Sequence, residues 1–375
     1  MEAKGRVFYL LLPIFFLNGI GLLALSSASL IFVNGVYLKK QIVAMILAWI
    51  TCAIFAQIPL PWFFKQRTVL FALAFTGACL VLIPGIGHMT NGSRRWIHIP
   101  GFSIQVSEFV KIALVIWLAG YVRKNESYCI NLFKGFLKPI GICGGLAFLV
   151  LCEPDYGTAF LMMSVALTLL FLFGTGLCHL SLFLAVGGIS FLGLIFLSPI
   201  RLRRIISFFN VEEHRFDATY QLWQGILCFA SGGLYGSGIG LGRQKLSYLP
   251  EAHTDFIFPI IGEEFGSLFA IIVIFGFLIF AILALVLLCP KQDSFVKALG
   301  FGAVLMITFQ AIINIGVVTG CTPTKGIALP FISYGGSNLV AMYALAGLII
   351  NCLRSDDTLA VRNSGDETGS QNWLK

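Results

Sequence analysis

Long apolar runs dominate the chain, and short polar segments separate them. A helix needs about 20 mainly apolar residues to cross the hydrocarbon core of a membrane. Runs of that kind lie near residues 7–30, 40–57, 68–86, 107–122, 138–152, 157–175, 179–198, 267–289, 298–319 and 335–352. The pattern predicts an all-α, polytopic membrane protein with about ten transmembrane helices.

The polar segments predict the rest of the organisation. A large extracytoplasmic loop, roughly residues 199–266, is expected between helices 7 and 8. Residues 1–354 form a single transmembrane domain in this interpretation, and the polar residues 355–375 form a disordered cytoplasmic tail. Lys and Arg are more frequent in the short segments on the side of the termini, which predicts that both termini are cytoplasmic.

Composition and charge narrow the class of protein. Hydrophobic residues make up 58% of the 375 residues and charged residues only 11%, against about 25% charged residues in soluble domains. This excludes a soluble enzyme, a disordered chain and a classical nucleic-acid binder. The net charge of +8 suits anionic lipids or phosphates as partners. The ten cysteines lie singly without zinc-ligand spacing, so neither disulfides nor a zinc site are predicted.

Two ionisable residues lie at the start of an otherwise apolar run, Glu108 and Lys111. Such groups cost about 2.5–3.5 kcal/mol each inside a membrane, so their presence needs a reason. Three positions apart on a helix, they share a face and can pair. Either the pair only locks two helices together, or it lines a polar cavity that opens to the outer surface.

Asp255 is the second candidate, because polar residues crowd around it just before an apolar stretch. Glu251 and His253 precede it, and Glu263 and Glu264 follow at the mouth of the next span. Asp255 is either a helix N-cap or a general base beside the membrane.

Other polar residues of the predicted outer loops have both structural and chemical interpretations. Asp155 follows Glu153 and Pro154, a pattern typical of a structural turn. Arg94 and Arg95 either anchor at lipid headgroups or bind a diphosphate, and Lys325 is a similar candidate. Ser333 begins a tight glycine turn and lacks a His–Asp arrangement, so it is not predicted to be a nucleophile.

Within the large loop, two features predict structure without chemistry. The evenly spaced glycines between Gly236 and Gly242 lack a preceding strand, so they indicate a flexible or re-entrant segment, with no dinucleotide site. Residues 220–224 and the apolar residues after them predict a short amphipathic helix at the membrane interface.

Several of these segments together resemble the SEDS family (shape, elongation, division and sporulation proteins), and more the FtsW-type division branch than the RodA-type elongation branch. The segments that carry the resemblance are Asn91-Gly-Ser-Arg-Arg-Trp-Ile97, Gln105-Val-Ser-Glu-Phe-Val-Lys111, Glu153-Pro-Asp-Tyr-Gly-Thr158, Lys245-Leu-Ser-Tyr-Leu-Pro-Glu-Ala-His-Thr-Asp-Phe-Ile-Phe258, Gly262-Glu-Glu264 and Leu329-Pro-Phe-Ile-Ser-Tyr-Gly-Gly-Ser337. Two departures are that Val106 and Glu153 stand where the family usually has Pro and Gln.

The resemblance implies a peptidoglycan glycosyltransferase that polymerises lipid II into β-1,4 glycan strands and releases undecaprenyl diphosphate, with inversion. It implies that Asp255 is the catalytic base, and it leads us to expect the diphosphate at Arg94, Arg95, Lys111 and Lys245, with Glu108 orienting Lys111. Supporting positions are expected at Asp155, Glu251, His253, Glu263, Glu264 and Ser333. A divalent cation (Mg²⁺ or Mn²⁺) could bridge the phosphates, although the sequence shows no dedicated metal ligands.

The resemblance also implies a place and partners. The expected location is the bacterial cytoplasmic (inner) membrane, at the division septum. The expected partners are a class B penicillin-binding protein transpeptidase, other division proteins and membrane lipids, with no nucleic acid. A lipid II flippase and a non-catalytic division scaffold are the alternatives. The costly residues cluster toward one face, which favours surface chemistry over translocation.

Overall fold

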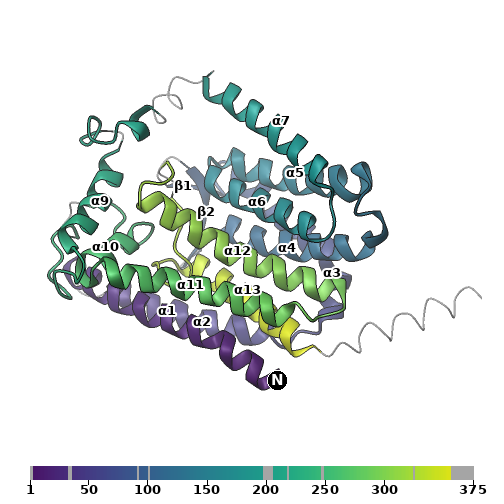
Figure 1. Ribbon diagram of the computed structural model, residues 1–375, viewed down its shortest axis with the longest axis horizontal. Coiled ribbons are helices and arrows are strands. Elements are labelled where there is room, and N and C mark those ends of the chain that lie inside the picture. The colour runs from purple at the N-terminus through teal and green to yellow at the C-terminus, as the bar shows by residue number, and fades with distance from the viewer. Residues whose placement is uncertain are drawn as a thin grey trace, which may run out of the picture.

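The protein is a bundle of long helices with one small sheet, seen in a computed structural model that describes residues 3–32, 36–90, 93–99, 102–196, 206–217, 219–245, 249–323 and 326–355. The long helices are α1 (Ala3–Phe32), α2 (Val36–Phe55), α3 (Leu60–Leu82), α4 (Val106–Lys124), α5 (Lys138–Cys152), α6 (Tyr156–Leu172), α7 (Leu177–Phe196), α11 (Ser267–Leu288), α12 (Ser294–Val318) and α13 (Gly336–Arg354). Figure 1 shows α11, α12 and α13 side by side, with α7 apart at the top.

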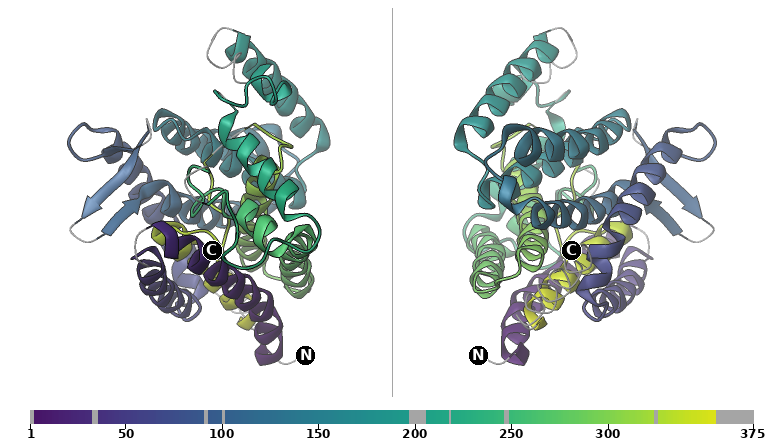
Figure 2. Two further views of the ribbon diagram at one scale, coloured as in Figure 1. Left: turned by 90° about the vertical axis from the view of Figure 1, so that its left-hand side faces the viewer. Right: turned by 90° about the vertical axis from the view of Figure 1, so that its right-hand side faces the viewer.

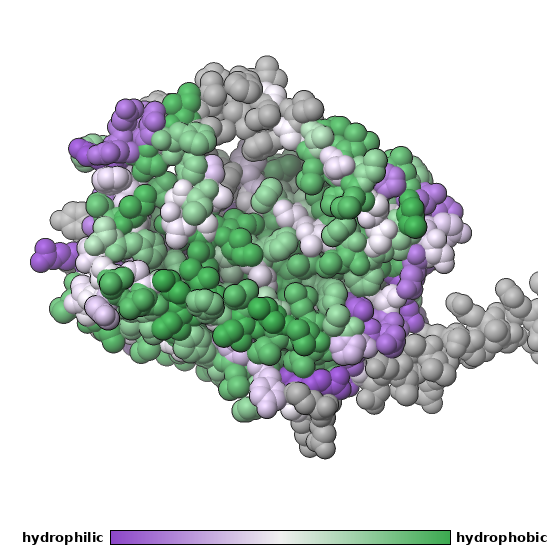
Figure 3. Space-filling view, in the orientation of Figure 1, coloured by the Kyte–Doolittle hydropathy of each residue, from purple (hydrophilic) through white to green (hydrophobic). Residues whose placement is uncertain are grey.

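Each of the ten predicted apolar runs coincides with one of these helices. Among the described residues, seven helices are long and apolar enough to cross a membrane, the fourth of them being the continuous stretch Leu132–Cys152 that includes α5. α6 and the described part of α7 are apolar but shorter. The count of ten spans and the orientation of the termini therefore stay predictions. Figure 3 shows the apolar surface as a broad band with hydrophilic residues at both ends.

α13 forms the centre of the bundle and is buried along almost its whole length. It packs against α2, α12, α4 and α1. α12 is also mostly buried, and its first turn is capped by Asp293, whose carboxylate accepts hydrogen bonds from the amides of Phe295 and Val296 at 2.9 and 3.1 Å. These two helices run between the polar ends of the bundle, so residues on them can join both ends.

A three-stranded antiparallel sheet was missing from the all-α prediction. It consists of β1 (His88–Thr90), β2 (Ser93–Ile99) and β3 (Phe102–Gln105), in that order, and projects from the side of the bundle in Figure 2. Neighbouring side chains of a strand point to opposite faces. Arg94 and Arg95 are neighbours on β2, so their side chains point to opposite faces of the sheet.

The segment between α7 and α11 contains two further helices, α9 (Tyr220–Gly232) and α10 (Ile257–Phe265). α9 confirms the short helix expected after residue 220, whereas α10 was not predicted. Gly266 separates α10 from α11 with φ 88°, and a Cβ there would stand 2.2 Å from the carbonyl oxygen of Leu234. Only glycine fits that close approach. Arg201, Arg203 and Arg204 of the large loop, the diphosphate candidate Lys325, and the tail from residue 356 lie outside the described residues.

Candidate active site

The residue predicted as the base, Asp255, lies just before α10, at the end of the bundle where α9 and α10 gather (Figure 1). Its residue is half-buried, and its main-chain carbonyl accepts a hydrogen bond from the buried amide of Asn314 on α12 at 2.8 Å. The N-cap of α10 is Phe256, which makes no side-chain cap bond. The helix-cap alternative for Asp255 therefore does not describe its position.

The surroundings of Asp255 favour its neutral form at low pH and its ionised form only near neutrality. The pKa of Asp255 is raised to about 7, mainly by burial; the positive charge of Arg95 opposes this rise, and the negative charges of Glu251, Asp155 and Glu108 add to it. A carboxyl with a pKa near the working pH has the balance of proton affinity and ionisation that a general base needs.

Arg95 links this region to the turn between α5 and α6. Its guanidinium lies 3.3 Å from the carboxylate of Asp155, which also accepts hydrogen bonds from the amide and hydroxyl of Thr158 at 3.1 and 3.0 Å. Asp155 thus caps α6, in keeping with the predicted structural turn, and in addition holds the arginine. Arg94 is the preceding residue of β2, so its side chain points to the other face of the strand, away from this cluster.

Glu153 lies two residues before Asp155 and is completely buried. Neither of its carboxylate oxygens has a hydrogen-bond partner among the described residues. The pKa of Glu153 is raised to about 8, mainly by burial, with a further rise from the charge of Asp155 and an opposing effect of Arg95 included in that value. This carboxyl is therefore mostly protonated at neutral pH.

Glu108 and Lys111 form the predicted pair inside the bundle. The ammonium of Lys111 lies 2.7 Å from Glu108 and donates a hydrogen bond to the side-chain oxygen of Gln310 at 2.6 Å. Lys111 is 1% exposed and Glu108 6% exposed. This geometry fits the helix-locking alternative, and Glu108 still acts on the charge of Asp255. Sequence reasoning missed Gln310 and Asn314, although two amides one turn apart in an apolar helix are a detectable signal.

The residues around Asp255 in the chain fix the loop. The ring of His253 stacks on Tyr37 at 4.5 Å between centroids, and its carbonyl accepts a hydrogen bond from the amide of Tyr334 at 3.0 Å. Burial lowers the pKa of His253, so the neutral imidazole is favoured. Glu251 accepts a hydrogen bond from the hydroxyl of Thr254 at 2.8 Å. The hydroxyl of Ser333 accepts a hydrogen bond from the amide of Leu329 at 2.8 Å. This contact agrees with a structural role of Ser333 in the turn.

Lys245, Glu263 and Glu264 form a second buried cluster. The ammonium of Lys245 lies 2.5 Å from Glu264 and 2.6 Å from the hydroxyl of Ser27 on α1, and Lys245 is fully buried. Glu263 accepts a hydrogen bond from the amide of Arg243 at 2.7 Å. We therefore assign Lys245 to holding α1 against α10, in place of the expected contact with a diphosphate.

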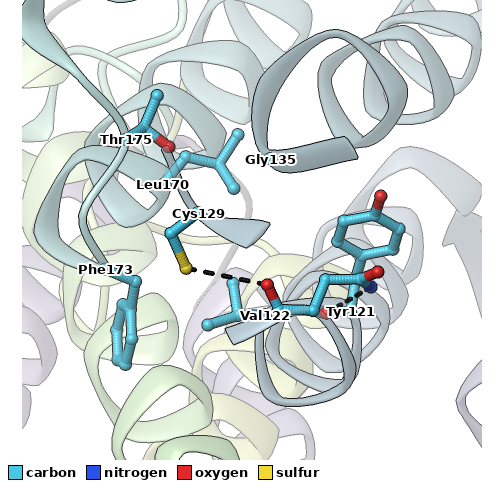
Figure 4. Close-up of a pocket in the computed structure, with 8 residues that line it drawn as sticks. Tyr121, Val122, Cys129, Gly135, Leu170, Phe173 and Thr175 are labelled. Carbon is cyan, nitrogen blue, oxygen red and sulfur yellow. Dashed lines mark hydrogen bonds between the residues drawn. The ribbon is translucent and has the colours of Figure 1, made fainter. Parts of the chain in front are cut away.

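Two cavities lie away from Asp255. One, at the far end of α4, has a volume of about 10 Å³, room for about one water molecule, between residues that include Tyr121, Cys129 and Thr175 (Figure 4). The other is an apolar groove of about 280 Å³ between α2, α3 and α4. Among the described residues, no group of three or more His, Cys, Asp or Glu is placed to hold a metal. A divalent cation that bridges the phosphates of the substrate therefore stays a prediction.

A bundle of apolar helices with hydrophilic residues at both ends, and a cluster of carboxyl groups and an arginine at one of them, is the architecture of a polytopic membrane protein with a polar site at its surface. The family model for FtsW, RodA and SpoVE cell cycle proteins matches residues 8–358. The chain belongs to this family, and it is a multi-pass membrane protein.

Individual relatives agree with the family match. The chain is 38% identical over 344 residues to a probable peptidoglycan glycosyltransferase FtsW of Coxiella burnetii, which covers 89% of this chain and 92% of the relative. It is 38% identical over 289 residues to stage V sporulation protein E of Bacillus subtilis, covering 76% of this chain and 78% of the relative.

Solved structures confirm the fold. A chain from a peptidoglycan synthase complex that coordinates polymerization and crosslinking superimposes with a TM-score of 0.79, at 23% identity, over 92% of this chain and 96% of that chain. The rod shape determining protein RodA of Thermus thermophilus gives a TM-score of 0.68, at 22% identity, over 92% of this chain and 95% of that chain.

Proposed function

We propose that the protein is a peptidoglycan glycosyltransferase that polymerises lipid II at the outer face of the bacterial cytoplasmic membrane. The observation that carries the proposal is Asp255, a half-buried carboxyl with a pKa of about 7 at the polar end of the bundle, beside Arg95. Its relatives named as probable peptidoglycan glycosyltransferases support this chemistry.

In the proposed reaction, Asp255 takes the proton of the 4-hydroxyl of an incoming sugar. The hydroxyl oxygen forms a bond to C1 of the growing glycan, while the bond from C1 to the diphosphate breaks. Because an α-linked diphosphate gives a β-1,4 bond, one displacement with inversion accounts for the product. Arg95, whose side chain is 20% exposed, supplies positive charge near the departing diphosphate.

The apolar groove offers a binding place for the isoprenoid tail of the substrate. It is lined only by apolar side chains. They are Phe55, Leu70, Leu73, Ala74, Val106, Phe109, Val110, Ile112 and Ala113. The groove runs from Val106 at the start of α4 to Phe55 at the end of α2, so it extends along the bundle from the polar end. A tail in this groove would leave the diphosphate at the end where Asp255 lies.

Partners and location follow from the same proposal. We expect a class B penicillin-binding protein to crosslink the strands made here, because a complex of that kind contains the structural neighbour. Other division proteins, a septal location and cytoplasmic termini are expected from the division-branch resemblance. No step of the proposed reaction runs through a metal ion.

The direct test is polymerisation of lipid II by the purified protein in detergent, compared with Asp255→Asn. We expect long glycan strands from the wild type and none from the folded variant. A lipid II flippase and a non-catalytic scaffold both lack polymerising activity, so neither would make glycan strands in this assay. Near-normal polymerisation by Asp255→Asn would show that this carboxyl is not the base.

A further inference from the structure

Two buried amides on α12 face the candidate site from inside the bundle. Gln310 is 0% and Asn314 is 1% exposed, and their spacing of four residues places them on the same face of the helix. The side-chain nitrogen of Asn314 donates to the carbonyl of Asp255 at 2.8 Å and to the carbonyl of Ile327 at 2.6 Å. Asn314 thus ties the segment that carries Asp255 to the segment that precedes α13.

Gln310 extends the same set of contacts by one turn of α12. Its nitrogen donates to the carbonyl of Ala328 at 2.9 Å and to the side-chain oxygen of Asn338 at 2.7 Å. Its oxygen accepts the hydrogen bond from Lys111 at 2.6 Å. Consecutive carbonyls of Ile327 and Ala328 are therefore held by consecutive turns of one helix.

The segment held in this way lies against the Asp255 carboxylate. A Cβ built on Gly326 would stand 2.7 Å from the Oδ2 atom of Asp255. The φ of Gly326 is not in the left-handed region, so alanine would fit the backbone but not the space. Gly326 itself is exposed. The carboxylate is thus placed between its own loop and the main chain at Gly326.

We propose that Asn314 and Gln310 are positioning residues that clamp the 326–328 segment and the Asp255 loop to α12, and that Gly326 forms the wall that sets the Asp255 carboxylate. This inference rests on the proposed function, since it assigns a reaction step to Asp255. Misplacement of a reacting group by about 1 Å can lower a rate about 100-fold, so such a clamp matters even without touching the substrate.

The chain contains a matched control for Asn314. Asn351 on α13 is 8% exposed, and its side-chain nitrogen also donates to two main-chain carbonyls, of Phe55 at 2.8 Å and Ile58 at 2.6 Å. It lies near the opposite end of the bundle, beside the turn between α2 and α3. Replacing either asparagine with leucine removes two donors from two carbonyls, so both changes weaken the fold by the same kind of loss.

The experiment compares Asn314→Leu with Asn351→Leu in the full-length protein. Lipid II polymerisation gives kcat and KM, and thermal unfolding in the same detergent gives the loss of stability. We expect Asn314→Leu to lower kcat 10- to 100-fold with KM within about twofold, and Asn351→Leu to change kcat less than twofold at a similar loss of stability. Equal falls in kcat in the two variants would overturn the proposal.

Gly326→Ala tests the wall without touching the core. Because Gly326 is exposed, we expect an unchanged unfolding temperature and a fall in kcat of about 10-fold as the methyl group displaces the carboxylate. If Gly326→Ala has the same kcat as the wild type, the main chain at Gly326 does not set the position of the Asp255 carboxylate. This variant keeps the proposal testable if Asn314→Leu fails to fold.

Wild type and Asp255→Asn are measured alongside to separate the two claims. If wild type polymerises lipid II, Asp255→Asn does not, and Asn314→Leu and Gly326→Ala retain full kcat, the positioning claim fails while the proposed function stands. If wild type makes no glycan, the proposed function itself fails. If wild type and Asp255→Asn are equally active, the assignment of Asp255 as the base fails while the polymerising activity stands.

Discussion

The two ends of the bundle differ in how their charged groups are paired. At the end where α4 finishes and α12 begins, Arg123 lies 3.1 Å from Asp293, which also caps α12. Ser294 donates a hydrogen bond to Glu126 at 2.7 Å. Each of these carboxylates has an ion-pair or hydrogen-bond partner, so the charged groups at this end join helices.

At the other end, the pKa values of two carboxyl groups, Asp255 and Glu153, are raised. Glu108, Asp155 and Glu251 add to the rise at Asp255, and among the described residues Arg95 opposes it. Glu153 has no partner for either oxygen among the described residues. Compensated charges hold a fold together, whereas an uncompensated group has a perturbed pKa, which is typical of functional sites.

The largest difference in rate is expected between two variants in which one aspartate, at one end or the other, is replaced with asparagine of the same shape. Asp255→Asn should lower lipid II polymerisation about 100- to 10,000-fold, because this is the usual contribution of a general base. Asp293→Asn should change the rate less than twofold, since Asn still caps α12. The measurement is glycan product per minute from purified protein. Similar losses in the two variants would contradict the difference between the ends.

Substitutions of Glu108 and Lys111 test whether this buried ion pair takes part in catalysis or only holds helices together. Lys111→Met leaves Glu108 buried and unpaired, which costs about 3–5 kcal/mol of stability. Adding Glu108→Gln removes the unpaired charge. We expect the double variant to recover most of the unfolding temperature and of the polymerisation rate, as a helix lock requires. A stable but inactive double variant would instead assign Lys111 to the substrate.

Arg95 and its neighbour Arg94 give a matched test of the electrostatic argument. Arg95→Gln removes the charge that lowers the pKa of Asp255, so the carboxylate should form only at higher pH. The rate at pH 7 should fall about three- to tenfold, with partial recovery at pH 8.5. Arg94→Gln, on the other face of β2, should leave the pH profile unmoved. A parallel shift in both variants would refute this assignment.

The smallest expected effect concerns Glu153. Its pKa of about 8 in the folded protein lies above the ordinary value of 4.5, so folding binds a proton and stability falls as pH rises from about 4.5 to about 8. Glu153→Gln should therefore raise the unfolding temperature by a few degrees at pH 8 and by almost nothing at pH 4.5. Thermal unfolding at the two pH values checks this, and equal changes at both would show that Glu153 is ionised in the folded state.

The apolar runs predicted the long helices well, because membrane helices are specified by local composition. The short sheet was missed because β1–β3 have only three, seven and four residues, and their pairing depends on contacts across two turns. Asp255, Arg95 and Glu108 were singled out as costly or crowded residues, and the structure brings them into one electrostatic group.

Other parts of the site could not be predicted from local pattern. The sequence placed Lys245 among the substrate-binding cations because it is basic and near Asp255 in the chain. In the structure its ammonium pairs with Glu264 in a separate buried cluster. Asn314 and Gln310 were missed because neutral amides in a helix acquire meaning only from the carbonyls that they meet. Those carbonyls belong to segments distant in the sequence, or separated from the helix by a loop.

The most direct test of the central claim is the pH dependence of kcat/KM for lipid II polymerisation by the wild-type protein, because kcat/KM reports the pKa values of the substrate-free protein. If the surroundings of Asp255 set it as the base, kcat/KM rises about tenfold per pH unit at low pH and levels off with an apparent pKa of about 7. A kcat/KM that is constant from about pH 5 to pH 8.5 would contradict the account, because a carboxyl of ordinary pKa would then be sufficient.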